Sequence, residues 1–275
     1  MRPPITYYGG KTRMLDILIP MIPKHRVYVE AFAGGASLFW AKAKSKVEVL
    51  NDINRNVVNF YEVMNTQFDE LMTEIRNTLH CEETHKFANH IYHNPDRFEA
   101  VKRAWALWVS SNMSFGGELG SPNFKWVVNQ ADNWSPAVAI NNRKLQFGIY
   151  KNRLEKVCIH SKKAERLIPK IDHEDVFFYL DPPYVGARQG HYEGYNQEHF
   201  DELLQILSKI KGKFLMSSYQ NDQLTQCVKA SGWNHYSVRM RKGISHKNET
   251  KTEVLTWNYE LTLPSSVRPK TLSIF

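Results

Sequence analysis

Short apolar runs that end in glycine or acidic residues recur along this chain. The first covers residues 27–32 and is broken by Gly34-Gly35, after which residues 36–44 have a helix-like composition. A second apolar run covers residues 47–50 and is followed by Asp52. The order strand, glycine turn, helix, strand, acid predicts the beginning of a doubly wound parallel sheet.

The same alternation returns further along the chain. Asn54 can cap a helix that reaches about residue 65. The run at residues 176–180 is apolar throughout, which is typical of a strand covered by helices on both faces of the sheet. We therefore predict an α/β fold with a Rossmann-like, mostly parallel sheet. The other predicted strands are residues 157–160, 214–217, 233–240 and 252–257, and the other predicted helices are residues 164–168, 198–209 and 222–231.

A stretch of different character separates the two parts of this pattern. Leu71, Ile75 and Leu79 repeat with helical spacing, and so do the apolar residues between 104 and 108. The chain then becomes rich in Gly, Asn, Ser, Pro and aromatic residues, which indicates a loop or hairpin, and it is too long for a plain connector. We predict an inserted helical subdomain at residues 67–143 and a catalytic domain made of residues 1–66 and 144–275.

The charge of the chain narrows the range of its partners. Its 275 residues include 36 Lys and Arg against 28 Asp and Glu, which gives a formal net charge of +8. Such an excess favours a polyanionic partner such as nucleic acid, or a membrane surface. No long uncharged stretch suits a membrane span, and residues 1–4 lack the apolar core of a signal peptide. We expect a cytoplasmic protein with no membrane partner.

Neither the cysteines nor the histidines predict a metal site. Cys81, Cys158 and Cys227 are far apart and form no CxxC pair. Among four histidines between residues 80 and 93, only His90 and His93 share a helical face, and no further ligand has a matching spacing. We expect no metal.

The strongest chemical signal follows the apolar run at residues 176–180, where the sequence reads Asp181-Pro182-Pro183-Tyr184. Each proline restricts the residue before it to extended geometry, so the turn is stiff. It presents a carboxylate, a main-chain carbonyl and an aromatic ring together. Two acceptors and a stacking surface suit the exocyclic amine of an adenine.

Two more features lie at predicted strand ends, where open α/β sheets bind ligands. Gly34 permits close approach of the backbone to a ligand, and Asp52 suits the hydroxyls of a ribose. This pair also occurs in nicotinamide enzymes. The third glycine of GxGxxG is missing here, however, and such an enzyme explains neither Pro182-Pro183 nor the basic charge.

Several segments together resemble the Dam-type DNA adenine methylases, and the resemblance covers nearly the whole chain. It is carried by residues 7–11, 30–37, 52–54, 181–184, 195–203, 217–221 and 253–259. The resemblance implies a methyltransferase sheet, S-adenosylmethionine as cofactor, and site-specific methylation of adenine N6 in double-stranded DNA. It also implies that the insertion at residues 67–143 selects the target sequence.

The resemblance assigns roles to individual residues. Tyr7 and Lys11 would contact the cofactor, with Lys11 near its methionine carboxylate. Phe32 and Gly34 would belong to the cofactor loop, and Asp52 would hold the ribose hydroxyls. The catalytic residues would be Asp181, Pro182 and Tyr184, and Asp181 would also serve the cofactor pocket.

The sequence departs from the family pattern in two places. Lys163 occupies the position where family members carry an acid near the adenine of the cofactor. The segment at residues 115–120 lacks the arginine that accompanies recognition of GATC, so another target sequence is expected. The residues predicted to contact DNA are Asn123, Lys125, Arg143 and Lys144.

Other functions are compatible with the same residues. The enzyme could methylate another planar amine, such as cytosine N4 or adenine in RNA, or the chain could be a catalytically silent DNA-binding relative. A companion restriction enzyme is a further possible partner.

Overall fold

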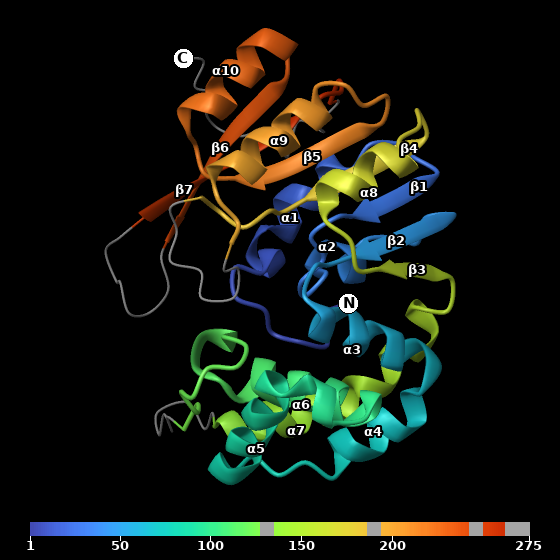
Figure 1. The fold of residues 1–275 in the computed structure, drawn as a ribbon, viewed down its shortest axis with the longest axis vertical. Coiled ribbons are helices and arrows are strands. Elements are labelled where there is room, and N and C mark those ends of the chain that lie inside the picture. The colour runs from blue at the N-terminus through green and yellow to red at the C-terminus, as the bar shows by residue number, and fades with distance from the viewer. Residues whose placement is uncertain (127–134, 186–193, 242–249, 262–275) are drawn as a thin grey trace. The chain divides into compact units, whose positions relative to one another are not determined.

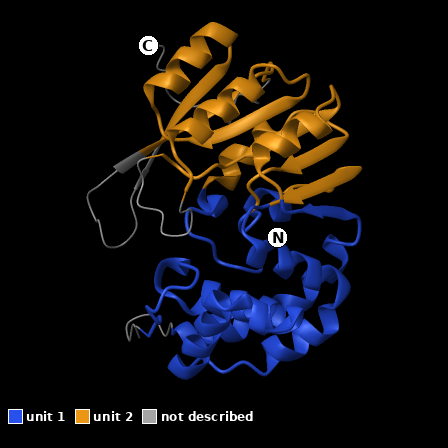
Figure 2. Ribbon diagram, in the orientation of Figure 1, with its two compact units in different colours: residues 1–13, 34–41, 52–161 blue, residues 14–33, 42–51, 162–275 orange. Residues whose placement is uncertain are grey.

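The computed structural model describes residues 1–126, 135–185, 194–241 and 250–261. The chain forms two compact units, shown in different colours in Figure 2. Unit 1 comprises residues 1–13, 34–41 and 52–161, and unit 2 comprises residues 14–33, 42–51 and 162–275. The structure does not test the assignment of residues 67–143 to target recognition, which stays a prediction.

A seven-stranded sheet organises the α/β part of the fold (Figure 1). Its order is β3 (Val157–His160), β2 (Val47–Asn51), β1 (Val27–Glu30), β4 (Val176–Leu180), β5 (Lys213–Ser218), β7 (Thr250–Trp257) and β6 (Asn234–Arg241). Strand β1 runs parallel to β2 and β4, and β4 runs parallel to β5. Strand β7 runs antiparallel to both β5 and β6. The prediction of a mostly parallel α/β sheet is confirmed.

Strand β4 is buried along its whole length because apolar groups cover both faces of the sheet in unit 2. On one face, Phe178 belongs to a core that also includes side chains of α8 (Ala164–Ile171) and α9 (Gln197–Leu207). On the other face, the ring of Phe177 packs against Tyr28 and Tyr259. This alternation explains why the strand reads as an unbroken apolar run.

The predicted helices of unit 2 are present with small shifts at their ends. Helix α9 begins after Asn196, whose side chain accepts a hydrogen bond from His199 N at 3.1 Å. Helix α10 (Asp222–Ser231) begins after Asn221, which accepts from Leu224 N at 2.7 Å. Two short elements precede the sheet, α1 (Leu15–Leu18) and the 3-10 turn η2 (Ile19–Met21).

Unit 1 is built around helix α6 (Ala100–Met113), in which every residue from 104 to 113 is buried. Helix α3 (Arg55–Thr66) begins as predicted, because the side chain of Asn54 accepts from Asn56 N at 3.0 Å. The remaining helices are α2 (Ser37–Ala41), α4 (Phe68–Arg76), α5 (Glu82–His93) and α7 (Pro136–Gln146), with 3-10 turns at η1 (Lys11–Met14), η3 (Pro95–Arg97), η4 (Phe115–Gly117) and η6 (Phe147–Arg153).

The helical spacing of Leu71, Ile75 and Leu79 holds only in part. Leu71 and Ile75 are fully buried, but α4 ends at Arg76, and Leu79 lies beyond it with 70% of its surface exposed. The expectation for Leu79 is therefore wrong. Across the described ranges, no helix is both long and apolar enough to cross a membrane.

Candidate active site

The Asp181-Pro182-Pro183-Tyr184 turn lies directly after β4, at the carboxyl end of the strand. The hydroxyl of Tyr184 lies 2.9 Å from Ser217 Oγ and donates to Asp181 Oδ1 at 3.3 Å. It also lies 3.4 Å from Glu253 Oε2. The turn is thus anchored to β5 and β7 through the phenol of Tyr184.

The electrostatics of this group keep Tyr184 neutral. Burial raises the pKa of Tyr184 well above its ordinary value, and the negative charges of Asp181 and Glu253 raise it further. The hydroxyl therefore keeps its proton at physiological pH and remains a hydrogen-bond donor.

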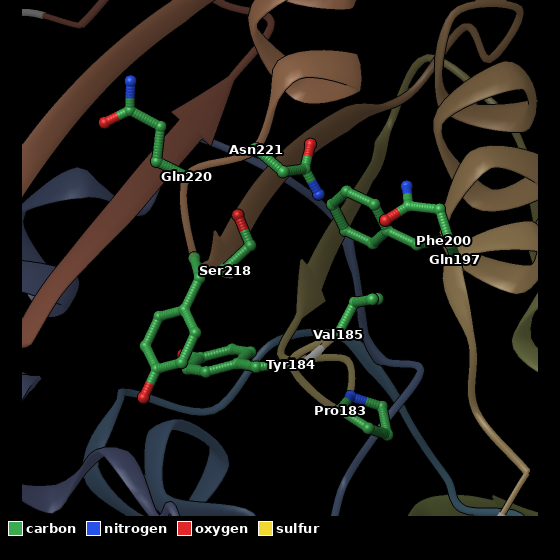
Figure 3. A pocket seen from close by; sticks show the side chains of 9 residues that line it. Pro183, Tyr184, Val185, Gln197, Phe200, Ser218, Gln220 and Asn221 are labelled. Carbon is green, nitrogen blue, oxygen red and sulfur yellow. The ribbon is translucent and has the colours of Figure 1, made fainter. Parts of the chain in front are cut away.

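A pocket opens beside this turn within unit 2 (Figure 3). Its wall includes Tyr184 from the turn and Phe200 from α9, and the ring centroids of Tyr184 and Tyr219 lie 4.3 Å apart. The pocket lies beyond the ends of β4 and β5, where open α/β sheets bind ligands. The lining residues are Pro183, Tyr184, Val185, Gln197, Phe200, Ser218, Tyr219, Gln220 and Asn221.

Three carboxylates act electrostatically on a buried tyrosine hydroxyl in the same unit. Tyr179 is 4% exposed, and its hydroxyl has no hydrogen-bond partner among the described residues. Burial raises the pKa of Tyr179, as do the charges of Asp181, Glu30 and Glu253. Three carboxylates around an unsatisfied hydroxyl suit a positively charged group such as the sulfonium of S-adenosylmethionine. The residues present therefore fit this cofactor.

Unit 1 contains the glycine turn that was predicted to approach the cofactor. Gly34 has a φ of +47°, which favours glycine, and a Cβ atom there would lie 2.9 Å from Tyr7 Cε1. Its amide donates to Asp52 Oδ2 at 2.7 Å, and its carbonyl accepts from the Tyr61 hydroxyl at 2.9 Å. The structure thus brings Tyr7, Gly34 and Asp52 together.

Asp52 is held in one orientation by the backbone. Its second oxygen, Oδ1, accepts from Asn54 N at 2.8 Å, and the residue is only 4% exposed. Burial raises the pKa of Asp52, while the amides of Asn54, Gly34 and Ile53 lower it. A carboxylate accepts about four hydrogen bonds, so both oxygens retain acceptor capacity for hydroxyl groups.

The other predicted cofactor residues are distributed over both units. Lys11 is in unit 1 and 5% exposed, and its ammonium donates to Gly9 O at 2.9 Å. Phe32 is in unit 2, where its ring meets the edge of Tyr195 at a centroid distance of 6.1 Å. Lys163 is exposed at the beginning of α8, and the acid nearest to it in the chain is the buried Glu165.

The predicted DNA-contacting residues all lie in unit 1. Asn123 is exposed, whereas Lys125, Arg143 and Lys144 are partly buried. Arg143 Nη2 donates to Thr6 Oγ1 at 3.0 Å, and burial lowers the pKa of Arg143. Burial and the charge of Arg143 lower the pKa of Lys125, so these two cations lie within electrostatic range of each other.

The segment that carries Asn123 has the form of the predicted hairpin. Ser114 and Phe124 form an antiparallel bridge, and Phe115 N donates to Asn123 O at 2.8 Å. The fully buried His85 lies 2.8 Å from Ser114 Oγ and supports the base of this hairpin, a role that the sequence did not reveal. Among the described residues, no group of three His, Cys, Asp or Glu side chains could hold a metal ion.

Comparison with known proteins gives a consistent result. Residues 7–244 match the model of the D12 class N6 adenine-specific DNA methyltransferases. The type II methyltransferase M1.LlaDCHI of Lactococcus lactis subsp. cremoris is 24% identical over 279 residues, which covers 94% of this chain and 96% of that protein. The type II methyltransferase M.MjaIII of Methanocaldococcus jannaschii is 21% identical, with 94% and 99% covered. The DNA N-6-adenine-methyltransferase of Escherichia phage P1 is 23% identical, but the chain covers only 33% of it.

Proposed function

The chain belongs to the D12 class N6 adenine-specific DNA methyltransferase family, and on this premise we propose which of its side chains perform the reaction. It is an S-adenosylmethionine-dependent enzyme that methylates N6 of adenine in DNA. The observation that carries our assignment is the Asp181–Tyr184 turn, which closes β4 beside a pocket lined by Tyr184 and Phe200.

Asp181 and the carbonyl of Pro182 accept the two hydrogens of adenine N6. Both acceptors direct the lone pair of N6 out of conjugation with the ring and toward the methyl group. Alignment of N6 with that methyl group then supplies most of the rate enhancement. Bound S-adenosylmethionine supplies an electrophilic methyl group on a sulfonium. An adenine inside a duplex cannot reach such a site, so the substrate is double-stranded DNA with the target base flipped out, and the ring of Tyr184 offers a stacking surface.

The cofactor is held by Tyr7, Lys11, Gly34, Phe32 and Asp52, with a further contact from Asp181. The backbone bonds of Asp52 support its role, because they fix a carboxylate that still has acceptor capacity for the ribose hydroxyls. The ammonium of Lys11 suits the methionine carboxylate.

Product analysis tests the function directly. We expect duplex DNA incubated with the enzyme and S-adenosylmethionine to yield N6-methyldeoxyadenosine when the digested nucleosides are separated by mass. N4-methylcytosine, or methylated adenine from RNA alone, would instead identify another planar amine as substrate. Binding of DNA without any methylated product would identify a catalytically silent relative.

Target choice is proposed to reside in residues 114–144, of which residues 127–134 lie outside the described part of the chain. Asn123 can pair with adenine, and Arg143 can pair with guanine or contact a phosphate. Lys125 and Lys144 suit phosphates. We expect exchange of residues 114–144 with the matching segment of a relative of known specificity to change the methylated sequence, as mapped by sequencing of modified bases. An active hybrid that keeps the original target would place recognition elsewhere.

The type II methyltransferases among the relatives support a role in a restriction-modification system. We propose that this enzyme protects DNA inside the cell against a companion restriction enzyme that cuts the same unmodified sequence. Resistance of DNA from expressing cells to that endonuclease tests this proposal.

A further inference from the structure

One buried hydroxyl in the wall of the pocket has no part in the reaction proposed above. Ser218, the last residue of β5, is 2% exposed, and its Oγ has no hydrogen-bond partner among the described residues. Figure 3 shows this side chain in the pocket wall. Most buried polar side chains are hydrogen-bonded, because an unpaired polar group is costly away from water. An unpaired hydroxyl in a pocket wall therefore indicates that a bound ligand supplies its partner.

The position of Ser218 in β5 is one that packing alone would fill with an apolar residue. Alternate residues of a strand line the same face of the sheet, and on this face Phe214 and Met216 belong to the hydrophobic core. Ser218 pairs with Val254 of β7, which belongs to the same core. An alanine here would continue the apolar face without burying a hydroxyl. The serine introduces a polar group where the core meets the pocket.

The three amide side chains of the pocket wall differ from Ser218. Gln197 is exposed, and its Nε2 donates to Asp201 Oδ1 at 2.6 Å. The side-chain oxygen of Asn221 caps helix α10, and Gln220 is exposed. Ser218 is instead both buried and unpaired among the described residues. Its hydroxyl is therefore a group of the wall that gains a hydrogen bond only when the pocket is filled.

The pocket has the chemistry that a flipped base requires. Enzymes read a flipped base by stacking it between aromatic or apolar side chains and by hydrogen bonds to its Watson–Crick edge. The rings of Tyr184 and Phe200 line this pocket. The Watson–Crick edge of adenine presents the amine N6 and, beside it, the ring nitrogen N1, which has a lone pair and no hydrogen. A serine hydroxyl can donate to such an acceptor.

We propose that Ser218 contacts the substrate and that its hydroxyl donates a hydrogen bond to N1 of the flipped adenine. This inference rests on the proposed function, because it takes the pocket beside the Asp181–Tyr184 turn as the site of the base. It adds a donor to the two acceptors proposed for N6, so that two adjacent atoms of one edge are read. Guanine carries a hydrogen on N1 and cannot accept this bond, so the contact favours adenine over guanine.

A cycle of enzyme and substrate variants tests the contact on the full-length enzyme. The substrates are duplexes that carry, at the mapped target position, adenine or 1-deazaadenine, in which a C–H group replaces N1. We expect Ser218→Ala to lower kcat/KM for the adenine duplex about fivefold, the scale of one neutral hydrogen bond. On the 1-deazaadenine duplex, wild type and Ser218→Ala should agree within about twofold, because the acceptor is absent from both.

A second substrate and a second variant are the matched controls. A 7-deazaadenine duplex keeps N1, so the fivefold loss in Ser218→Ala should persist on it. Thr256 is fully buried on the neighbouring strand β7, opposite Met216, and its hydroxyl also lacks a partner among the described residues. Thr256 is not one of the residues that line the pocket, so Thr256→Val should keep the wild-type kcat/KM on every duplex.

The outcomes separate this contact from the rest of the proposed site. Equal losses of Ser218→Ala on adenine and 1-deazaadenine, or no loss on adenine, would overturn the contact. A loss that disappears only with 7-deazaadenine would overturn the assignment to N1. Ser218→Cys retains the size and has a weaker donor, and it supplies the same comparison if Ser218→Ala does not fold. An active Asp181→Ala variant would refute the proposed role of the turn, and it is measured separately.

Discussion

Replacing Asp181 with alanine is expected to lower the single-turnover rate of methyl transfer on the order of a thousandfold, the scale seen when an enzyme loses one preorganised electrostatic group. In the proposed mechanism, the carboxylate accepts a hydrogen of the amine and stabilises the positive charge that develops on N6 during transfer. Its loss should therefore appear mainly in turnover. Asp181→Asn should lose less activity, because an amide oxygen still accepts one hydrogen bond.

Rapid-quench measurement with saturating DNA and labelled S-adenosylmethionine isolates the chemical step. Asp175→Ala is the matched control, because Asp175 is an exposed acid at the opposite end of β4. Near-wild-type single-turnover activity of Asp181→Ala would remove Asp181 from the mechanism.

Replacing Asp52 with alanine is expected to weaken binding of S-adenosylmethionine about 100-fold. Two hydrogen bonds to a charged acceptor are worth about 3 kcal/mol, and each 1.4 kcal/mol is tenfold in affinity. The change also removes the acceptor that holds Gly34 N, so the glycine turn loses its fixed position. Asp52→Asn is not conservative here, because both oxygens accept backbone N–H groups and an amide nitrogen would face a donor.

Calorimetry of cofactor binding and of DNA binding separates the two substrates. We expect DNA affinity in the absence of cofactor to stay within about threefold for Asp52→Ala, while cofactor affinity falls. Asp69→Ala is the control, since Asp69 makes an exposed ion pair with Lys151 in the same unit, and such pairs contribute little to stability. Unchanged affinity for S-adenosylmethionine would exclude Asp52 from the cofactor site.

Local signals allowed much of the fold and part of the site to be predicted. Strand β4 could be predicted from its own residues alone, because a strand that is buried on both faces is apolar at every position. The cap at Asn54 is equally local, since its side chain bonds the amide of Asn56 two residues away. The turn at Asp181 was recognisable because two prolines restrict its backbone whatever surrounds it.

Other parts of the site depend on long-range pairing, which a single sequence does not encode locally. Glu253 meets Ser217 across 36 positions and Tyr184 across 69, through the register of β5 with β7. Helix α5 was not predicted because its buried face carries polar side chains. There His85 Nε2 lies 2.8 Å from Ser114 Oγ and Asn89 Nδ2 donates to Ser121 O, so polar residues interrupt the apolar periodicity of the helix.

The placement of β7 between β5 and β6 has a consequence for synthesis on the ribosome. Strand β6 leaves the ribosome before β7, yet β7 is the strand with which it pairs in the described sheet. Domains generally fold as units, and during synthesis the N-terminal segments are made first. A nascent chain that ends before residue 250 has no β7 to pair with β6, and it lacks Glu253, which contacts Tyr184 of the proposed catalytic turn. We therefore expect methylation activity only from chains in which β7 has been synthesised. A prematurely terminated chain that lacks this strand should not methylate DNA.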